Sequence, residues 1–380
     1  MFKSLYLQNF KCFREFEKPL LFSHINLLTG SNGRGKSSIF QSMLLLSQSY
    51  ESGKDLRNIR LTGRYLSLGT YKDVIYGGNT DDKISIKLTT DNEKDNNLLF
   101  VCKLGSAGID TSIDNIYVND IPLGSETTMG MSDNNGMIVE EHKNINFAPT
   151  STYESFSQLA NVYYISADRI GPQNSAKMLE DLVDDKIGIH GEKVINSLYE
   201  RNVDFQKLIA KELSLILGGA SINVTSSDFE YIRMYVDSVD GSKGFKPVNV
   251  GFGYSYILPI VVLPLIIPSG SKLFIENPEA HLHPGAQSRV MDFLIRVCKE
   301  KNIQLFIETH SDHIVNSLRI AIKEKRNGLS AQDATLIHLD RENTFKQPVI
   351  WQIEIDKDGN LSDYPHDFLE EWGNQMSMLV

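Results

Sequence analysis

Apolar and polar positions alternate at the start of the chain. Residues 2–9 (FKSLYLQN) show the pattern of a half-buried strand. Residues 10–16 contain three phenylalanines and predict a hairpin that returns the chain to a second apolar run, residues 24–29 (HINLLT). Residues 39–46 (IFQSMLLL) carry the apolar period of a helix. The pattern therefore predicts two strands, a short connection rich in glycine, and a helix.

The middle of the chain changes character twice. Residues 84–88 and 98–102 predict a pair of antiparallel strands. Residues 105–150 are rich in Gly, Ser, Asn and Asp, which predicts a loop-rich excursion with a weak hairpin at residues 137–140. The apolar run at residues 162–165 then predicts a buried strand.

The next stretch favours helices. Residues 176–217 are mostly helix-forming, and residues 192–217 predict one amphipathic helix. Residues 222–236 and 245–250 predict strands.

Strands and helices alternate over the second half of the chain, and this alternation predicts right-handed crossovers and a parallel sheet. The predicted helices are residues 257–267, 284–301 and 310–325, and the predicted strands are residues 272–275, 303–307, 335–339 and 349–355.

The connection between the second strand and the first helix, residues 30–38, reads GSNGRGKSS. Gly30, Gly33 and Gly35 allow positive φ angles and a close approach to a ligand. The backbone amides can then surround a polyphosphate at a helix N-terminus, where the helix dipole also favours negative charge. A glycine-rich turn without a ligand is the alternative. The complete G-x-x-x-x-G-K-S pattern between a strand and a helix favours a phosphate loop.

Side chains of this loop have predicted roles. Lys36 would reach the β- and γ-phosphates, and the Ser37 hydroxyl would ligate Mg²⁺. Asn32 and Ser38 are further candidates for contacts with the nucleotide. The sequence therefore predicts a site for a nucleoside triphosphate with Mg²⁺.

Two charged turns have more than one interpretation. Lys11 and Arg14 in the first hairpin could reach a bound nucleotide, but a solvated turn is the favoured interpretation. Asp168 and Arg169 follow the strand at residues 162–165 and precede Gly-Pro. That sharp exit lies at the strand edge where α/β sheets place ligands.

Composition narrows the class of protein. The 380 residues are 41% hydrophobic and 23% charged, as in a soluble globular protein. No apolar run approaches the ~20 residues of a membrane span, and the N-terminus lacks the apolar block of a signal peptide. The three cysteines form no CxxC pair and are interpreted as reduced thiols of a cytoplasmic protein. The net charge of −10 argues against nucleic-acid binding by charge alone, although a local basic patch built across a dimer stays open.

A second group of chemical residues follows the strand at residues 272–275. Glu276 ends this strand, where a phosphate-loop protein places an acid near Mg²⁺, and Glu279 could orient or deprotonate a water. His281 and His283 lack the cysteine or acid spacing of a zinc site, so capping or interface roles are favoured.

The next strand also ends in polar residues. His310 follows the predicted strand at residues 303–307, at the edge where it can contact a γ-phosphate. The alternative is a histidine that only caps the following helix. Its combination with the phosphate loop favours the phosphate contact.

The order of these segments resembles a known family. NLLTGSNGRGKSS, KLFIENPEAHLHP and FIETHSDHI resemble the Walker A, Walker B and switch-histidine segments of ABC-type ATPases. The opening FKSLYLQNFKCF, together with YYISADRIGP and NVGFGYSYILPI, resembles more closely the SMC, RecF and overcoming-lysogenization-defect (OLD) group. Within this group the likeness is to a bacterial AAA-family subfamily that has a short C-terminal domain of unknown function and no nuclease domain. It covers nearly the whole chain except residues 105–150.

The resemblance implies an α/β fold, that of an ABC-ATPase head. A parallel sheet carries the phosphate loop, with an N-terminal antiparallel β subdomain and a helical insertion. The chain is expected to form one ATPase domain made of residues 1–104 (β subdomain with Walker A), 105–150 (loop-rich insertion), 151–217 (helical subdomain), 218–340 (signature, Walker B and switch-histidine core) and 341–380 (C-terminal extension).

The resemblance also implies a homodimer, or a higher oligomer, formed around ATP. Each ATP with its Mg²⁺ would lie between one subunit's phosphate loop and the other's signature segment, which falls at residues 251–255. Gly253 and Ser255 are the expected contacts in that segment. Glu276 takes the position of the Mg²⁺-side acid and of a catalytic residue, and His310 that of the switch histidine.

Two departures from the family pattern bear on catalysis. Gly251 stands where signature segments place a serine, so Ser255 is expected to supply the hydroxyl. Asn277 stands where many ABC-type ATPases place the catalytic glutamate. An amide cannot accept a proton as a carboxylate does, so Glu279 is predicted to act as the base, or hydrolysis is slow.

The leading hypothesis is an ATPase that gates a nucleic-acid-directed process, such as DNA repair or anti-phage defence. Residues 326–380 are too few for the nuclease domain of OLD relatives, so a nuclease is expected as a separate effector protein. The alternative is a nucleotide-dependent sensor or scaffold with negligible turnover, which Asn277 and Gly251 favour. A membrane-transporter subunit is disfavoured because the N-terminal segment is of the SMC type.

Overall fold

A computed structural model describes most of the chain as two compact units. The first unit comprises Met1–Val162, Ala334–Ile353 and Asp363–Val380, and the second comprises Tyr163–Asp333 and Glu354–Ser362. The described residues are 1–50, 59–93, 96–105, 111–122, 128–131, 137–141, 144–148, 156–179, 187–219, 221–226, 230–237, 243–340, 347–365, 368 and 376–378.

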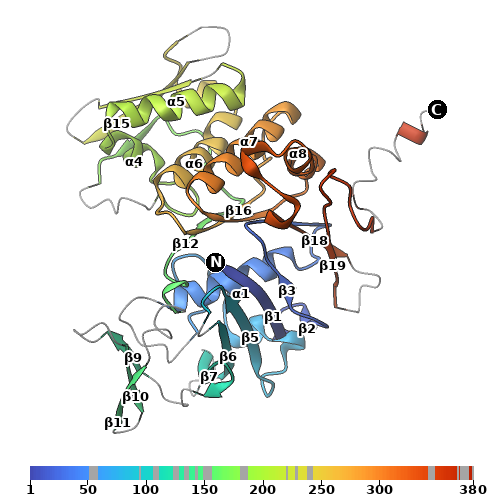
Figure 1. The fold of residues 1–380 in the computed structure, drawn as a ribbon. Helices are drawn as coiled ribbons and strands as arrows, with labels where there is room; N and C mark the ends of the chain where they lie inside the picture. Colours follow the sequence, from blue (N-terminus) through green and yellow to red (C-terminus); the bar gives the residue numbers. More distant parts are fainter. Residues whose placement is uncertain are drawn as a thin grey trace. The chain divides into compact units, whose positions relative to one another are not determined.

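An antiparallel sheet forms the N-terminal part of the first unit (Figure 1). Its strands follow the order β2-β1-β5-β6-β7-β8, and β3 also pairs with β1. Buried and partly exposed residues alternate along β5, as the sequence predicts for a strand with one face in the core. The strands are β1 (Phe2–Phe10), β2 (Phe13–Glu15), β3 (Leu20–Leu21), β5 (Ile84–Thr90), β6 (Asn97–Leu104), β7 (Thr111–Val118) and β8 (Ile121–Pro122).

The prediction of a loop-rich excursion over residues 105–150 is wrong, although the hairpin predicted at residues 137–140 is confirmed by β10 and its antiparallel partner β11. Strand β7 extends the antiparallel sheet, and a separate three-stranded sheet follows, in the order β11-β10-β9. Its strands are β9 (Thr128–Met131), β10 (Met137–Glu141) and β11 (Asn144–Ala148). Polar residues between the apolar positions of β7, and a register shift in its pairing at Val101/Cys102, obscure the simple alternation that marks a strand.

Parallel strands hold the phosphate loop in the first unit. Strand β4 (Ile25–Gly30) pairs in parallel with β18 (Ala334–Asp340), and β18 pairs antiparallel with β19 (Val349–Ile353). Helix α1 (Lys36–Ser49) follows the loop, as predicted. Two short helices, α2 (Tyr71–Val74) and the 3₁₀ helix η1 (Tyr76–Gly78), lie between α1 and β5.

Strands and helices of the second unit also match the predicted alternation. Strand β16 (Lys272–Glu276) pairs in parallel with β17 (Gln304–Glu308), which sets Glu276 opposite Glu308. The Phe274 and Phe306 rings stack 4.5 Å apart between their centroids, so this sheet has an aromatic layer in its core. The helices are α6 (Gly253–Ile266), α7 (Pro284–Glu300) and α8 (Asp312–Lys323), with short 3₁₀ turns η3 (Arg326–Gly328) and η4 (Ala331–Asp333) before β18.

A small sheet and two helices also lie in the described part of the second unit. The sheet has the order β13-β15-β14, with β13 (Ser175–Lys177), β14 (Ser221–Ser226) and β15 (Tyr231–Asp237), and α5 packs on β14. The single helix predicted over residues 192–217 is wrong, because the structure has α4 (Val194–Glu200) and α5 (Val203–Leu217). Asn202 separates the two and caps α5 by accepting a hydrogen bond from the Phe205 amide at 2.9 Å.

Two further predictions need correction. Strand β12 (Val162–Ile165) confirms the strand predicted there, whereas β13 occupies the start of a stretch that was predicted to be mostly helical. Residues 245–250 are not a strand: Phe245 makes one bridge to Val236, and Pro247–Asn249 then forms the 3₁₀ helix η2. Proline at the start of that turn lacks the amide that a ladder requires. Much of the predicted extension, including residues 341–346 and 369–375, lies outside the described residues.

Among the described residues, no helix combines the length and the apolar character that crossing a membrane requires.

Candidate nucleotide site

Two glycines of the phosphate loop meet requirements that only glycine satisfies. Gly30 has φ +127°, and a Cβ there would lie 2.1 Å from the Leu339 carbonyl oxygen on the neighbouring strand. Gly35 has φ +101°, and a Cβ there would lie 2.7 Å from the Phe13 ring and 2.8 Å from the Cys12 sulfur. Strand β18 on one side and the first hairpin on the other therefore fix the path of the loop.

Lys36 begins α1, and its side chain is only 3% exposed. The ammonium donates hydrogen bonds to the carbonyl oxygens of Gly30 at 2.7 Å and Ser31 at 3.1 Å. The side chain thus bends back over the loop. This places a positive charge within the curve of the backbone, where a phosphate would lie.

The tip of the loop presents backbone to solvent. Ser31, Asn32 and Gly33 are exposed, and a Cβ at Gly33 would meet nothing within 4 Å. Ser37 and Ser38 lie half-buried in the first turn of the 14-residue helix α1. Exposed amides at a helix N-terminus, a lysine and two hydroxyls are donors and ligands suited to a polyphosphate with Mg²⁺, so the residues fit both groups.

The hairpin before the loop is not simply solvated. Lys11 is half-buried and donates to Gln41 Oε1 on α1 at 2.5 Å, and burial lowers the pKa of its ammonium. Arg14 is exposed. The interpretation as a solvated turn is therefore wrong for Lys11, which ties the hairpin to α1, and correct for Arg14.

Strand β16 ends at Glu276 and leads into a turn. We call residues 276–281, which carry the carboxylates of Glu276 and Glu279, the acidic turn. Glu276 accepts a hydrogen bond from the Ala167 amide at 3.2 Å, and burial raises the pKa of its carboxyl group. Asn277 has φ +44°, and its amide donates to the Glu308 carbonyl at 2.8 Å. Asn adopts left-handed φ values far more readily than Glu does, so the backbone itself accounts for an amide at this position.

Glu279 and His310 are brought together. Glu279 Oε1 accepts a hydrogen bond from the His310 amide, and Oε2 accepts one from Thr309 Oγ1, each at 2.8 Å. Ser311 is the residue that caps α8, by accepting from the amides of the next turn. His310 is exposed and is not the cap, so the capping alternative for it is wrong.

The signature segment at residues 251–255 starts α6. Gly251 and Phe252 are exposed, whereas a Cβ at Gly253 would lie 2.8 Å from the His281 carbonyl oxygen. Ser255 Oγ is buried and has no hydrogen-bond partner among the described residues. A contact between this hydroxyl and a second subunit's nucleotide would require α6 or its neighbours to move. The role of Ser255 stays a prediction.

Neither His281 nor His283 belongs to a metal cluster in the described part of the chain. His283 caps α7 by accepting a hydrogen bond from the Gly285 amide at 3.3 Å, which confirms the capping interpretation. The His281 ring packs on Tyr256 with ring centroids 4.3 Å apart.

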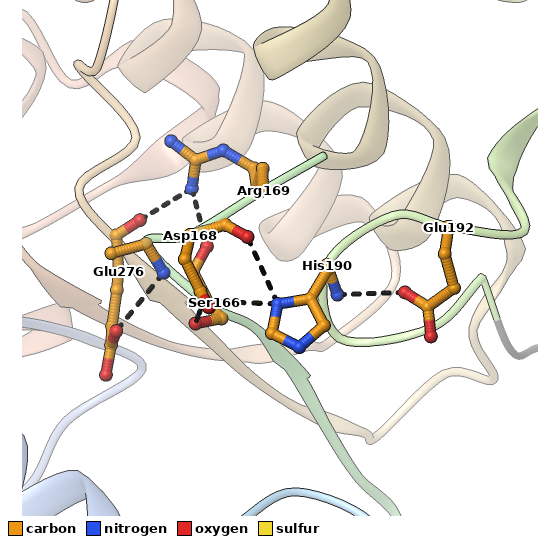
Figure 2. A network of polar contacts seen from close by, with 7 residues as sticks. Ser166, Asp168, Arg169, His190, Glu192 and Glu276 are labelled. Carbon is orange, nitrogen blue, oxygen red and sulfur yellow. Dashed lines mark hydrogen bonds and ion pairs between the residues drawn. The ribbon is translucent and has the colours of Figure 1, made fainter. Parts of the chain in front are cut away.

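Sequence reasoning missed a polar network beside Glu276 (Figure 2). Asp168 accepts a hydrogen bond from Ser166 and lies 3.1 Å from His190 Nδ1, and these contacts lower the pKa of its carboxyl group against the effect of burial. Arg169 donates to the Glu276 carbonyl at 2.7 Å. The only signal in the sequence is the charged pair at a strand exit, which carries no indication of its partners.

Residues 1–315 match the family described as AAA ATPase domain. The chain belongs to this family. Residues 329–379 match a second family, described as a protein of unknown function (DUF3696). A protein of Helicobacter pylori (strain ATCC 700392 / 26695) described as an ATP/GTP phosphatase is 25% identical over 352 residues, which span 86% of this chain and 89% of that protein.

The fold is that of an SMC head. A crystal structure of an SMC head bound to the C-winged helix domain of ScpA matches with a TM-score of 0.56 and 14% identity, over 92% of this chain and 97% of that one. An SMC head domain with an extended coiled coil, bound to the C-terminal domain of ScpA derived from Pyrococcus furiosus, matches with a TM-score of 0.54 and 12% identity, over 100% and 99%. This AAA-family member is thus an ATPase with an SMC-type α/β fold, as predicted.

Proposed function

We propose that the ATPase works as an ATP-dependent homodimer that gates a nucleic-acid-directed process. The observation that carries the dimer is the exposed start of α6. Gly251 is exposed, and Phe252 is 55% exposed although it is a large apolar side chain at a helix start. An exposed aromatic ring beside exposed helix-start backbone suits a contact with a partner subunit's nucleotide.

The residues have distinct roles in this proposal. Lys36 binds the β- and γ-phosphates, and Ser37 and Glu276 hold Mg²⁺, which when bound neutralises charge that develops on the phosphates. Glu279 orients or deprotonates the attacking water. Each of its oxygens already accepts one hydrogen bond, yet a carboxylate has about four acceptor sites, so each oxygen retains a lone pair for a water. His310 contacts the γ-phosphate from its exposed position.

The fold and the charge together favour an indirect role, in which the chain acts on nucleic acid through a second protein. The solved structures that this chain resembles are SMC heads, each bound to part of a second protein, ScpA. The net charge of −10 argues against direct binding by electrostatics alone. We therefore place the nucleic-acid chemistry, in DNA repair or anti-phage defence, on a separate effector such as a nuclease, with a local basic patch across the dimer as a further contact.

A sensor or scaffold with negligible turnover is the second candidate. Asn277 favours it, because its left-handed backbone disfavours a glutamate at this position. In that case Glu279 would only position His310.

Both candidates are tested with Glu279→Gln. The wild-type chain is expected to release phosphate from MgATP and to dimerise transiently. The variant is expected to bind ATP, to turn over about a hundredfold more slowly, as for loss of a general base, and to accumulate as a dimer in light scattering. Wild-type turnover in the variant contradicts the base role. If the wild-type chain binds ATP tightly but releases no phosphate, the result supports the sensor or scaffold.

The effector is tested separately. Affinity purification of the Glu279→Gln chain with ATP, with ADP and without nucleotide is expected to recover a nuclease or another nucleic-acid enzyme only with ATP. Recovery of homo-oligomers alone under all three conditions contradicts the separate effector.

A further inference from the structure

Arg169 holds the acidic turn by its backbone. Nη1 donates to the carbonyl oxygens of Ser166 at 3.0 Å and Glu276 at 2.7 Å, and Nη2 donates to the Asn277 carbonyl at 2.7 Å (Figure 2 shows the first two). The side chain is only 3% exposed. A planar guanidinium presents its donors in a fixed fork and so orients the carbonyls that it binds, whereas the ammonium of lysine is a point charge with rotatable donors.

The same guanidinium faces α6. Its central carbon lies 5.6 Å from the centre of the Tyr256 ring, within the range of a cation–π contact. The Tyr256 ring lies 4.3 Å from the His281 ring, and the Phe252 ring stacks 5.8 Å from that same histidine. Contacts thus run without a gap from the exposed start of α6 to both ends of the acidic turn.

The backbone of the acidic turn needs this support. Asn277 and His281 have φ values of +44° and +61°, in the left-handed region, which Asn tolerates and most other L-residues adopt only under strain. Such conformations persist where the surroundings fix them. Arg169 fixes the Asn277 end, and Tyr256 packs against the His281 end. The backbone at Gly253 also lies close to the His281 end of the turn. A Cβ on Gly253 would come within 2.8 Å of the His281 carbonyl oxygen.

Arg169 forms no hydrogen bond with the side-chain carboxylates of Glu276 and Glu279, which bond other residues. Its hydrogen bonds go to carbonyl oxygens, whereas Glu276 accepts from Ala167 and Glu279 from Thr309. The positive charge still attracts both carboxylates through space. Arg169 therefore orients the residues without occupying the oxygens that the chemistry uses.

We propose that Arg169 is a positioning residue that couples the start of α6 to the acidic turn. Contact at Phe252 shifts Tyr256 and His281, and Arg169 carries the change to the backbone that bears Glu276 and Glu279. The inference rests on the proposed ATP-dependent dimer, in which a partner subunit's nucleotide makes that contact. Hydrolysis then depends on dimerisation through this arginine.

The test compares Arg169→Lys with Arg296→Lys. Arg296 is a matched control, because its guanidinium also lies 5.6 Å from an aromatic ring, that of Phe293, in the same unit. Light scattering with ATP, the Kd for a fluorescent ATP analogue, kcat, KM and the melting temperature are measured for each. Arg169→Lys is expected to lower kcat about tenfold, to change Kd and KM less than about twofold, and to keep dimerisation, as for an interaction that acts only in the transition state. Arg296→Lys is expected to keep the wild-type kcat.

A second substitution, at Tyr256, tests the contact between α6 and Arg169 and provides an independent variant if Arg169→Lys does not fold. Tyr256→Leu leaves the three carbonyl bonds of Arg169 in place and removes the ring between Arg169 and His281. It is expected to lower kcat about fivefold, and to add little to Arg169→Lys in the double variant, because contacting residues on one path are not additive. If Arg169→Lys does not fold, Tyr256→Leu alone decides the question.

The outcomes separate this inference from the dimer itself. A wild-type chain that hydrolyses ATP as a monomer overturns the proposed dimer. A wild-type dimer with an unchanged kcat in Arg169→Lys or Tyr256→Leu overturns only the coupling. Equal losses of kcat and of ATP affinity, or strictly additive losses in the double variant, indicate a merely structural role and also overturn it.

Discussion

The phosphate loop and the acidic turn are built in different ways. The phosphate loop is one contiguous segment, residues 30–38, that offers exposed backbone and a lysine folded back on its own carbonyls. The acidic turn, residues 276–281, offers carboxylates, and its shape depends on side chains from three other segments. Arg169 is 107 residues away in the sequence from the carbonyl that it holds. One site is local and the other is assembled.

This difference predicts where substitutions act. A change inside the phosphate loop should remove the function or the fold of that loop directly. A change at the acidic turn should act through partners that lie elsewhere in the sequence, with smaller effects that are shared among several residues.

The largest effect is expected for Lys36→Ala. Removal of the ammonium leaves the β- and γ-phosphates without their nearest positive charge, so phosphate release from MgATP should fall roughly a thousandfold, the upper range for loss of one electrostatic contact. Lys72→Ala, an exposed lysine on α2, should keep the wild-type rate. Turnover in Lys36→Ala within about tenfold of wild type would show that the loop does not act as a local phosphate site.

Gly30→Ala is expected to have the next largest effect, on stability. The new Cβ would lie 2.1 Å from a strand carbonyl at φ +127°. Backbone strain of about 1–2 kcal/mol and overpacking of about 1–3 kcal/mol together predict a loss of roughly 3 kcal/mol in the free energy of unfolding. Denaturant unfolding measures it. Gly33→Ala, at φ +73° with open space around the Cβ, should cost only about 1 kcal/mol. Equal losses would contradict the steric explanation.

The contrast also explains what the sequence could predict. The chemical residues of the phosphate loop are contiguous in the sequence, so the motif alone indicated the strand, the turn and the start of α1, although β18 and the first hairpin also pack against the loop. Clear apolar periods likewise predicted β16, α7, β17 and α8. Strand β7 was missed because polar residues interrupt its alternation, and η2 was taken for a strand because Phe245, Val248 and Val250 are apolar.

The assembled site was predicted only in part. Glu276, Glu279 and His310 were identified from their places at strand ends, and the hydrogen bond between Glu279 and the His310 amide brings two of them together. Arg169 was noticed as part of a charged exit but without a role. Its hydrogen bonds go to carbonyl oxygens, which every residue has, so no pattern of side chains could indicate them.

The smallest effect is expected for Thr309→Val. Thr309 is fully buried, and its hydroxyl donates to Glu279 Oε2 at 2.8 Å and accepts from the Ser311 amide at 3.0 Å. Valine has the shape of threonine but no hydroxyl, so Glu279 Oε2 and the Ser311 amide each lose a hydrogen bond. This loss should lower the free energy of unfolding by about 1–2 kcal/mol. Because Glu279 loses one of its two anchors, kcat should fall about fivefold while KM stays unchanged.

Thr309→Ser is the matched control, because it keeps the hydroxyl and removes only a methyl group. It should lose stability through the small cavity, by about 1 kcal/mol, and keep kcat. Steady-state kinetics and thermal unfolding of both variants decide the matter. If the serine variant loses as much kcat as the valine variant, packing rather than the hydroxyl orients Glu279. The acidic turn would then be shaped by its core contacts, and the distinction between an assembled polar site and a local loop would be weaker than the hydrogen bonds suggest.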